Sequence, residues 1–218
     1  MTKVRNIIAA VISVFLISGC SNSEEPDPTP VVYNIVTYES TATDGSLSTF
    51  SYQVSGDSPL ITLSAKWDVP DGVRSGMRLL LAYIPESHTI ESGAVSIVSY
   101  AMIPGGEFKL AETVPESQRI RMVSMWRSGD YLNLHAEVTL SGQPSEISLY
   151  AESSTVDSSC PQAYIVIGEG DGELVEAAGR QLYASWNISE LWSLPSLEEI
   201  SVAYTDPSGE LKSIEFTK

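Results

Sequence analysis

Short runs of alternating or β-branched residues, separated by clusters of Gly, Pro, Asp and Ser, recur along most of this chain and most constrain its fold. Such runs are typical of half-buried strands joined by turns. The longest one is YLNLHAEVTL (Tyr131 to Leu140), in which every second residue from Leu132 onward is apolar. The pattern predicts an all-β fold.

The runs fall into two groups, separated by a break at Ile103 to Gly106 (IPGG). Because proline and paired glycines interrupt a strand pattern, we place a domain boundary there. Residues 189–197 suit a helical turn, with Ser189 as its cap. The first group of expected strands comprises residues 31–39, 47–54, 60–67, 77–84 and 94–102. The second group comprises residues 119–127, 131–140, 146–151, 163–167, 181–188, 200–205 and 211–217.

Residue types at particular positions make three of these predictions more specific: two turns and one buried strand. Ser128-Gly129-Asp130 lies between two runs and predicts a tight hairpin. Asp206-Pro207-Ser208-Gly209 has proline at its second position and glycine at its fourth, as type I turns prefer. Met77 to Ile84 (MRLLLAYI) is apolar on both faces, which favours a strand buried on both sides or a small closed barrel.

The N-terminus is organised like a secretory signal. Lys3 and Arg5 precede an apolar segment, residues 7–17, that is shorter than the ~20 residues of a membrane span. Ile17-Ser18-Gly19-Cys20 is similar to the bacterial lipobox, in which the cysteine is lipidated and becomes the first mature residue. We therefore predict a lipoprotein signal peptide over residues 1–19 and a lipid on Cys20. An ordinary secretory signal with a chance cysteine is the alternative.

The segment after the signal is acidic, and so is the rest of the chain. Residues 20–30 (CSNSEEPDPTP) carry three prolines and predict an extended tether without a packed core. Without residues 1–19 the chain keeps 10 of its 12 basic residues and all 28 acidic ones, for a formal charge of −18. Such a charge argues against binding to nucleic acid or to an anionic membrane surface.

Residues that carry catalytic chemistry are few and scattered. His88 and His135 are far apart in sequence, and alternation puts His135 on the polar face of its strand, solvated or paired. Cys160 is the one cysteine left after Cys20 is lipidated, so we expect no intramolecular disulfide and no activated thiol. Gly56-Asp57-Ser58 resembles the nucleophile block of GDSL esterases, but the Asp-x-x-His partner is absent and a turn is expected. We expect no enzyme activity, no catalytic residue and no cofactor.

Two patterns are candidate binding sites. GEGDGE, residues 168–173, places oxygen ligands at alternate positions without the order of an EF-hand, so we expect an acidic loop and keep a calcium site as the alternative. No other metal site is expected. Aromatic residues near strand ends could form a platform for sugar rings, although such residues also fill cores and cross-strand pairs. The candidate ligand-binding residues are Trp126, Tyr131, Tyr183 and Tyr204.

Four packing and turn motifs span the mature chain: GMRLLLAYI from Gly76, MWRSGDYLNL from Met125, SWNIS from Ser185 and ISVAYTDPSGELKSIEF from Ile200. In this order they resemble the NigD-like lipoproteins of Bacteroidota. The resemblance implies an OB-like β-barrel over residues 31–106 and an antiparallel β-sandwich over residues 107–218. It also implies an outer-membrane lipoprotein. Ser23-Glu24-Glu25 resembles the acidic signal for surface display, with a periplasm-facing protein as the alternative.

The family carries no established activity, so function is expected only by class. We expect a lipid-anchored, non-enzymatic interaction or structural module of a Gram-negative envelope. Its partners would be the membrane, through the lipid on Cys20, and a protein or glycan, but not nucleic acid. A glycan-binding accessory lipoprotein is one alternative, and an immunity protein against a secreted toxin, suggested by the family name, is the other.

Overall fold

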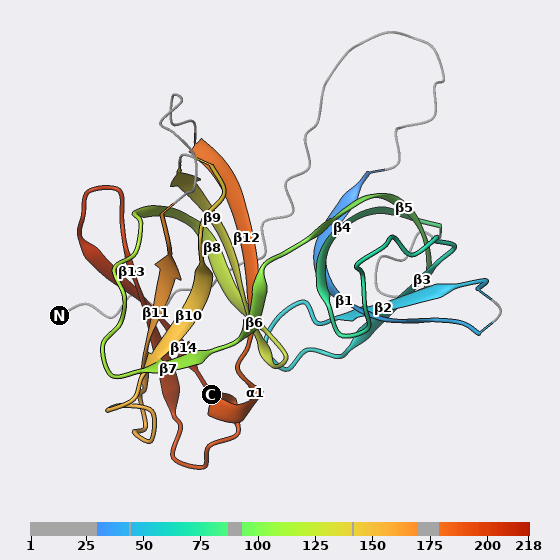
Figure 1. Cartoon of the computed structure of the whole chain (residues 1–218). Helices are drawn as coiled ribbons and strands as arrows, with labels where there is room; N and C mark the ends of the chain where they lie inside the picture. The colour runs from blue at the N-terminus through green and yellow to red at the C-terminus, as the bar shows by residue number, and fades with distance from the viewer. Residues whose placement is uncertain (1–29, 44, 87–92, 141, 170–178) are drawn as a thin grey trace, which may run out of the picture.

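The computed structural model describes residues 30–43, 45–86, 93–140, 142–169 and 179–218. These residues form a barrel and a two-sheet sandwich that lie side by side (Figure 1). In this described part, one short helix, α1 (Ser189–Trp192), accompanies fourteen strands. The prediction of an all-β fold is confirmed.

The barrel closes through the pairing of its first and fourth strands. The strand order is β1-β2-β3-β5-β4, with β4 returning to β1. Neighbours are antiparallel except for β3 and β5. A closed five-stranded barrel of this kind is OB-like, as the resemblance implies. The strands are β1 (Val32–Thr41), β2 (Ser48–Tyr52), β3 (Ile61–Ala65), β4 (Arg78–Pro85) and β5 (Gly93–Met102).

Strand β4 is apolar on both faces because each face is covered. Leu79, Leu81 and Tyr83 have no exposed surface and fill the barrel core. Alternation turns Arg78 and Ala82 to the opposite face, and both are buried. Arg78 contacts the sandwich there, so the outside of the barrel at β4 is an interface between the two domains.

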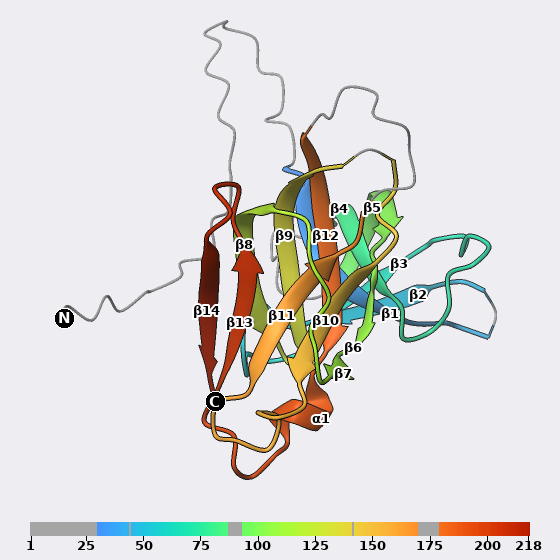
Figure 2. The ribbon, with the colours of Figure 1, turned by 60° about the vertical axis from the view of Figure 1, so that its left-hand side comes forward.

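The sandwich stacks two sheets, seen one in front of the other in Figure 2. One sheet has the order β14-β13-β11-β10-β7 and the other β6-β12-β9-β8. In chain order, the first five strands of the sandwich are β6 (Gly105–Glu107), β7 (Lys109–Ala111), β8 (Ile120–Ser128), β9 (Tyr131–Thr139) and β10 (Ile147–Glu152). The last four are β11 (Gln162–Ile167), β12 (Gly179–Asn187), β13 (Glu199–Thr205) and β14 (Leu211–Thr217).

Every second residue of β9 fills the sandwich core. Leu132, Leu134 and Ala136 have no exposed surface, and Leu149 and Val202 contribute from the facing sheet. The alternation predicted for this strand is therefore confirmed.

The sandwich is a mixed structure, not the purely antiparallel one expected. Three of its pairings are parallel: β6 with β12, β7 with β10, and β11 with β13. The three-residue strands β6 and β7 come from one segment that leads from one sheet to the other. They were not expected, because strands this short leave no periodic pattern. Strand β13 runs parallel to β11 because β12 and α1 form a crossover between them.

Both expected turns are confirmed, whereas the expected helix cap is not. Gly129 and Asp130 join β8 to β9 in a tight hairpin, and Gly129 has a φ of +56°. At the C-terminal hairpin the N–H of Gly209 donates to the carbonyl of Asp206 (2.9 Å). The Ser189 cap is wrong: Ser189 is the first helical residue, and its N–H donates to the side chain of Asn187 (2.8 Å).

Candidate functional site

The four candidate aromatic residues do not form one platform. Trp126, Tyr131 and Tyr183 lie on β8, β9 and β12, where the strand register puts them on the face turned away from the sandwich core. Tyr204 lies on β13 and packs against the core itself. The structure therefore places three of them on one sheet face and the fourth elsewhere.

The barrel covers the middle of that sheet face through Arg78. Its Nε donates to Ser185 Oγ (3.0 Å) and its Nη2 to Asn133 Oδ1 (3.0 Å). Its Nη1 donates to Thr37 Oγ1 within the barrel (2.8 Å). The guanidinium also lies over the ring of Tyr131, 4.2 Å from its centroid. Tyr131 is thus part of the interface between the domains.

Among the described residues, the groups that accept hydrogen bonds from this buried cation are all neutral. Arg78 is 9% exposed, and Asn133 and Ser185 have no exposed surface. Burial lowers the pKa of Arg78 to about 10, and Tyr131 and Glu39 oppose the change only in part. Asn133 Nδ2 has no hydrogen-bond partner among the described residues. Buried polar networks of this kind tolerate little rearrangement. We call the cluster of Arg78, Thr37, Asn133, Ser185 and Tyr131 the joint, because it fixes the barrel on the sheet.

A loop of the barrel forms a second contact, at the end of β8. The N–H of Gly56 donates to the carbonyl of Arg127 (2.8 Å), and the N–H of Gly129 donates to the carbonyl of Gly56 (2.9 Å). Gly56 thereby forms a parallel bridge with Ser128. Arg127 also pairs with Asp57 (2.6 Å). The expected turn at Gly56-Asp57-Ser58 is confirmed, with Asp57 engaged in an ion pair.

An aromatic group lies further along the same sheet face. His135 Nε2 is 2.5 Å from Gln181 Oε1, and the imidazole stacks on Tyr183 with 4.3 Å between ring centroids. Burial raises the pKa of Tyr183, and Tyr33 of the barrel adds to the change. His135 is paired, as its position on the polar face predicts. Tyr33 is 66% exposed, so this end of the interface reaches solvent.

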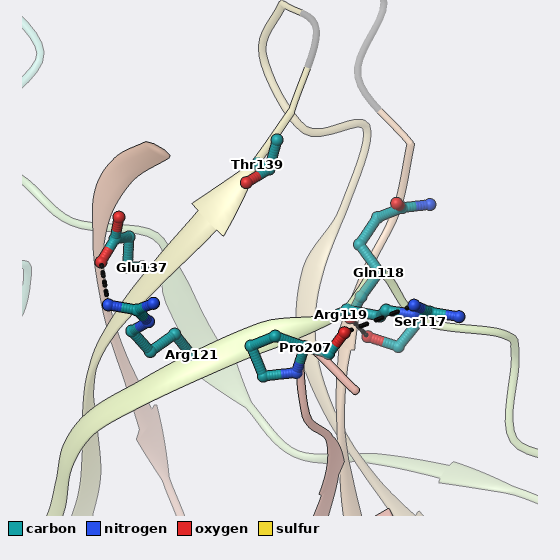
Figure 3. A pocket seen from close by; sticks show the side chains of 7 residues that line it. All are labelled: Ser117, Gln118, Arg119, Arg121, Glu137, Thr139 and Pro207. Carbon is teal, nitrogen blue, oxygen red and sulfur yellow. Dashed lines mark hydrogen bonds and ion pairs between the residues drawn. The ribbon is translucent and has the colours of Figure 1, made fainter. Parts of the chain in front are cut away.

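A groove of about 420 Å³ lies beyond the aromatic group, near the start of β8 (Figure 3). Arg119 Nη1 donates to the carbonyl of Pro207 (3.3 Å), and Arg121 lies 3.8 Å from Glu137. Neither guanidinium has a carboxylate at hydrogen-bonding distance within the described residues, so both keep unused donors. The groove is lined by Ser117, Gln118, Arg119, Arg121, Glu137, Thr139 and Pro207.

The remaining candidate residues from the sequence are a cysteine, which is not part of this sheet face or of the groove, and residues outside the described ranges. Cys160 is a free, half-buried thiol whose pKa is raised by burial and by Glu199, which favours the unreactive protonated form. Cys20, His88 and residues 170–173 of the acidic loop lie outside the described residues. In the described ranges no cluster of His, Cys, Asp and Glu is arranged to hold a metal ion. The same ranges contain no helix with the length and hydropathy of a membrane span.

The contacts of Arg78 with Asn133 and Ser185 were not predicted from the sequence. One signal was present: an arginine within a strand otherwise apolar on both faces, which implies that the arginine is covered too. Asn133 and Ser185 carried no such signal, because polar residues at alternate positions are normally solvated. Arg119 and Arg121, the two arginines of the groove, lie at alternate positions as well. Exposed residues on any strand do the same, so this spacing did not distinguish them.

The joint and the Gly56 bridge define the class of architecture: an OB-like barrel fixed on the outer face of a mixed β-sandwich. Neither a protein-family model nor a curated protein sequence matches the chain. Solved structures from Bacteroides and Parabacteroides species share this fold.

A protein of unknown function from Bacteroides vulgatus has a TM-score of 0.62 at 14% identity, covering 87% of this chain and 91% of its own. A protein from Parabacteroides distasonis described as toxin related has a TM-score of 0.60 at 13% identity, covering 86% and 94%. A NigD-like immunity protein from Bacteroides caccae has a TM-score of 0.58 at 15% identity, covering 85% and 96%. The expected likeness to the NigD-like fold is confirmed. At these identities the likeness shows the fold alone.

Proposed function

We propose that this protein is a lipid-anchored, non-enzymatic interaction module of the bacterial envelope that binds a protein partner through strand β5. The observation that carries the proposal is an exposed apolar strand end. Val98, Tyr100 and Met102 are 54%, 37% and 55% exposed, and Ser99 and Ala101 between them are exposed too. Beyond Ala94, the strand pairings of the described residues join β5 to β4 alone.

The sequence of β5 is more typical of a protein-binding surface than of a strand that faces only solvent. Residues Gly93–Met102 contain no charged side chain. Soluble proteins usually protect an open strand edge with charges, as the Lys212 and Glu215 side chains do on the edge strand β14. An exposed apolar strand without such protection marks an interaction surface. Tyr100 is also held in place by Trp67, whose ring centroid lies 5.2 Å away.

The charge of the whole chain indicates the partner's character. With a formal charge of −18 after the signal peptide, the protein favours a partner whose apolar contact surface has a basic rim. The lipid on Cys20 and the acidic tether would hold this surface away from the membrane. Outer-membrane location with surface display is part of the same proposal, with the periplasmic side as the alternative.

Immunity against a secreted toxin is the second candidate. The observation that favours it is the shared fold with proteins described as a NigD-like immunity protein and as toxin related. An immunity protein is itself a binding module, so the β5 surface would serve either role. The glycan-binding alternative has less support, because Tyr131 lies beneath Arg78 and Tyr204 packs against the core.

Photocrosslinking in intact cells tests the proposal. A photoreactive phenylalanine derivative at position 102 should give a discrete protein adduct, and Val98→Glu should abolish the adduct. The same derivative in place of Leu211, which is 63% exposed on β14, is the matched control and should give no adduct. The absence of an adduct at position 102, or equal adducts at both positions, would contradict the proposal.

A further inference from the structure

Strand β8 is an edge strand, and one end of its edge already carries an added segment. In the sheet order β6-β12-β9-β8 it has β9 on one side only. At its C-terminal end the barrel residue Gly56 forms a parallel bridge with Ser128 on the open side. The edge of β8 therefore accepts backbone hydrogen bonding from another part of this molecule, here a turn of the barrel.

The added segment brings a carboxylate to an arginine of the edge. Asp57 follows Gly56 directly and pairs with Arg127 at 2.6 Å. The side chain of Arg127 is 10% exposed and also lies over the ring of Trp192, 4.3 Å from its centroid. Backbone pairing and a charge-assisted contact thus occur together at this end of the strand.

At the other end of the same edge, two arginines have no carboxylate at hydrogen-bonding distance within the described residues. Arg119 and Arg121 line the groove of Figure 3, and the nearest acidic oxygen recorded for either is that of Glu137, 3.8 Å from Arg121. The side chain of Arg121 is 71% exposed. In a chain with 28 acidic residues, two arginines left in this way form a local exception to the overall charge.

Their spacing matches an extended ligand. Residues two apart on a strand point to the same side and lie roughly 6.8 Å apart. Alternate side chains of a peptide added to the edge would have the same spacing and would face the arginines as cross-strand neighbours. A register shift between Met122 and Ser124 ends the regular part of the edge. Within the described residues, the stretch without a strand partner on the open side therefore runs from Arg119, the residue before β8, to Met122.

We propose that an extended acidic segment of a partner protein adds to the edge of β8 from Arg119 to Met122, with two alternate carboxylates on Arg119 and Arg121. The segment would continue in space the pairing that Gly56 and Asp57 make at the other end of the strand. Glu137 competes with the incoming carboxylate for Arg121. The proposal goes beyond the β5 surface and does not depend on it.

Titration of the purified full chain in a neutral detergent with a synthetic peptide tests the proposal. The probe is a blocked peptide of eight residues in which glutamate alternates with threonine, and the control peptide has glutamine in place of glutamate. Measurement at about 0.15 M salt limits repulsion by the distant acids, because the Debye length is then about 8 Å. Affinity is measured by calorimetry, and the site is mapped by amide chemical shifts.

The glutamate peptide should bind and should shift the amides of Ile120 to Met122, and the glutamine peptide should bind more weakly. The Arg119→Gln, Arg121→Gln double variant should weaken binding by between about twofold and thirtyfold, the range for two exposed ion pairs. Glu137→Gln should strengthen it. Arg74→Gln, at an exposed arginine outside the groove, and Met102→Glu on β5 should leave it unchanged.

Absence of binding by the glutamate peptide up to millimolar concentration would overturn the proposal. Equal binding of the two peptides, equal binding by the double variant and the unchanged chain, or shifts confined to other strands would also overturn it. Because Met102→Glu disrupts the β5 surface alone, failure of this proposal and failure of the proposed function give different results.

Discussion

At the scale of single residues, the stability of the interface depends on a cation held by neutral groups. Removing Arg78 from water costs free energy, and three hydrogen bonds and the ring of Tyr131 offset that cost. Breaking such a network from one side is costly, because Asn133 and Ser185 would stay buried and lose the hydrogen bonds from Arg78. Only the bond from Ser185 Oγ to Asn133 Oδ1 (2.8 Å) would remain between them.

Arg78→Ala should therefore lower the free energy of unfolding by about 2–4 kcal/mol. Urea denaturation followed by circular dichroism measures the change. Arg74→Ala, an exposed arginine in the loop before β4, is the matched control and should change the free energy of unfolding by less than about 0.5 kcal/mol. Similar losses in both variants would show that the buried network does not carry the effect.

Glu146 makes stability depend on acid. Its carboxylate accepts hydrogen bonds from Lys109 (2.5 Å), Tyr150 (2.9 Å) and Ser148 (2.9 Å). These donors, Lys109 first, hold the pKa of Glu146 below its ordinary value of 4.5. A carboxyl pKa that is depressed in the folded state adds stability above the unfolded pKa, and this stability is lost as pH falls through the folded pKa.

Glu146→Gln should thus destabilise the protein at pH 7, and the difference from the unchanged chain should shrink as the pH falls below 4.5. Urea denaturation across this pH range measures it, with the exposed Glu116→Gln as control. A difference that stays constant, or grows in acid, would contradict the assignment.

At the scale of elements, one short segment ties the two sheets of the sandwich together. Strand β6 pairs with β12 in one sheet, and β7, one residue further on, pairs with β10 in the other. The approach to β12 is so close that a Cβ on Gly105 would lie 1.7 Å from the carbonyl oxygen of Ser185. At this position only glycine fits without displacing β6.

Gly105→Ala should push β6 away from β12 and lower the free energy of unfolding by about 1–3 kcal/mol, as overpacking does. It should also speed amide exchange in β6 and along β12. Gly106→Ala is the neighbouring control: no atom lies within 4 Å of its Cβ position, and its φ of +133° adds backbone strain alone. If Gly106→Ala speeds exchange in β12 as much as Gly105→Ala, the close approach is not the cause.

At the scale of the whole molecule, two contacts at separate places fix the barrel on the sandwich. Arg78 joins β4 to β9 and β12, and Gly56 joins the β2–β3 loop to the end of β8. Two contacts resist rotation as well as separation. The domains are therefore expected to be thermodynamically coupled.

Barrel and sandwich should unfold together. Pulsed hydrogen exchange at increasing urea, read by mass spectrometry, should give the same midpoint for peptides from β4 and from β9, because the interface links their stabilities. In Arg78→Ala the two midpoints should separate. Separate midpoints in the unchanged chain would instead mean that the interface contributes little to either domain.

The anchor is a property of the whole molecule as well. Cys20→Ser should prevent lipidation and release the protein from membranes, because the lipid is the expected attachment. Membrane fractionation followed by a salt wash measures it. A Cys20→Ser variant that stays with the membrane after the wash would disprove the anchor.

The sequence predicted the elements well where apolar residues alternate over several positions. Strands β1 to β5 and β8 to β14 lie within a few residues of the expected runs, because side-chain alternation is a local property of an extended chain. Strands β6 and β7 escaped prediction because their pairing depends on partners distant in sequence, β12 and β10. The helix cap failed for a local reason, since Asn187 supplied the acceptor in place of Ser189.

What the sequence determined by itself is therefore the class of fold, the face of β9 that fills the sandwich core and the acidity of the chain. The tertiary structure alone decided which polar residues leave solvent. Asn133 and Ser185 are polar at alternating positions, and they are buried only because a second domain, through Arg78, packs on their sheet. Burial against another domain is a long-range contact, and no local pattern encodes the identity of the surface that meets it.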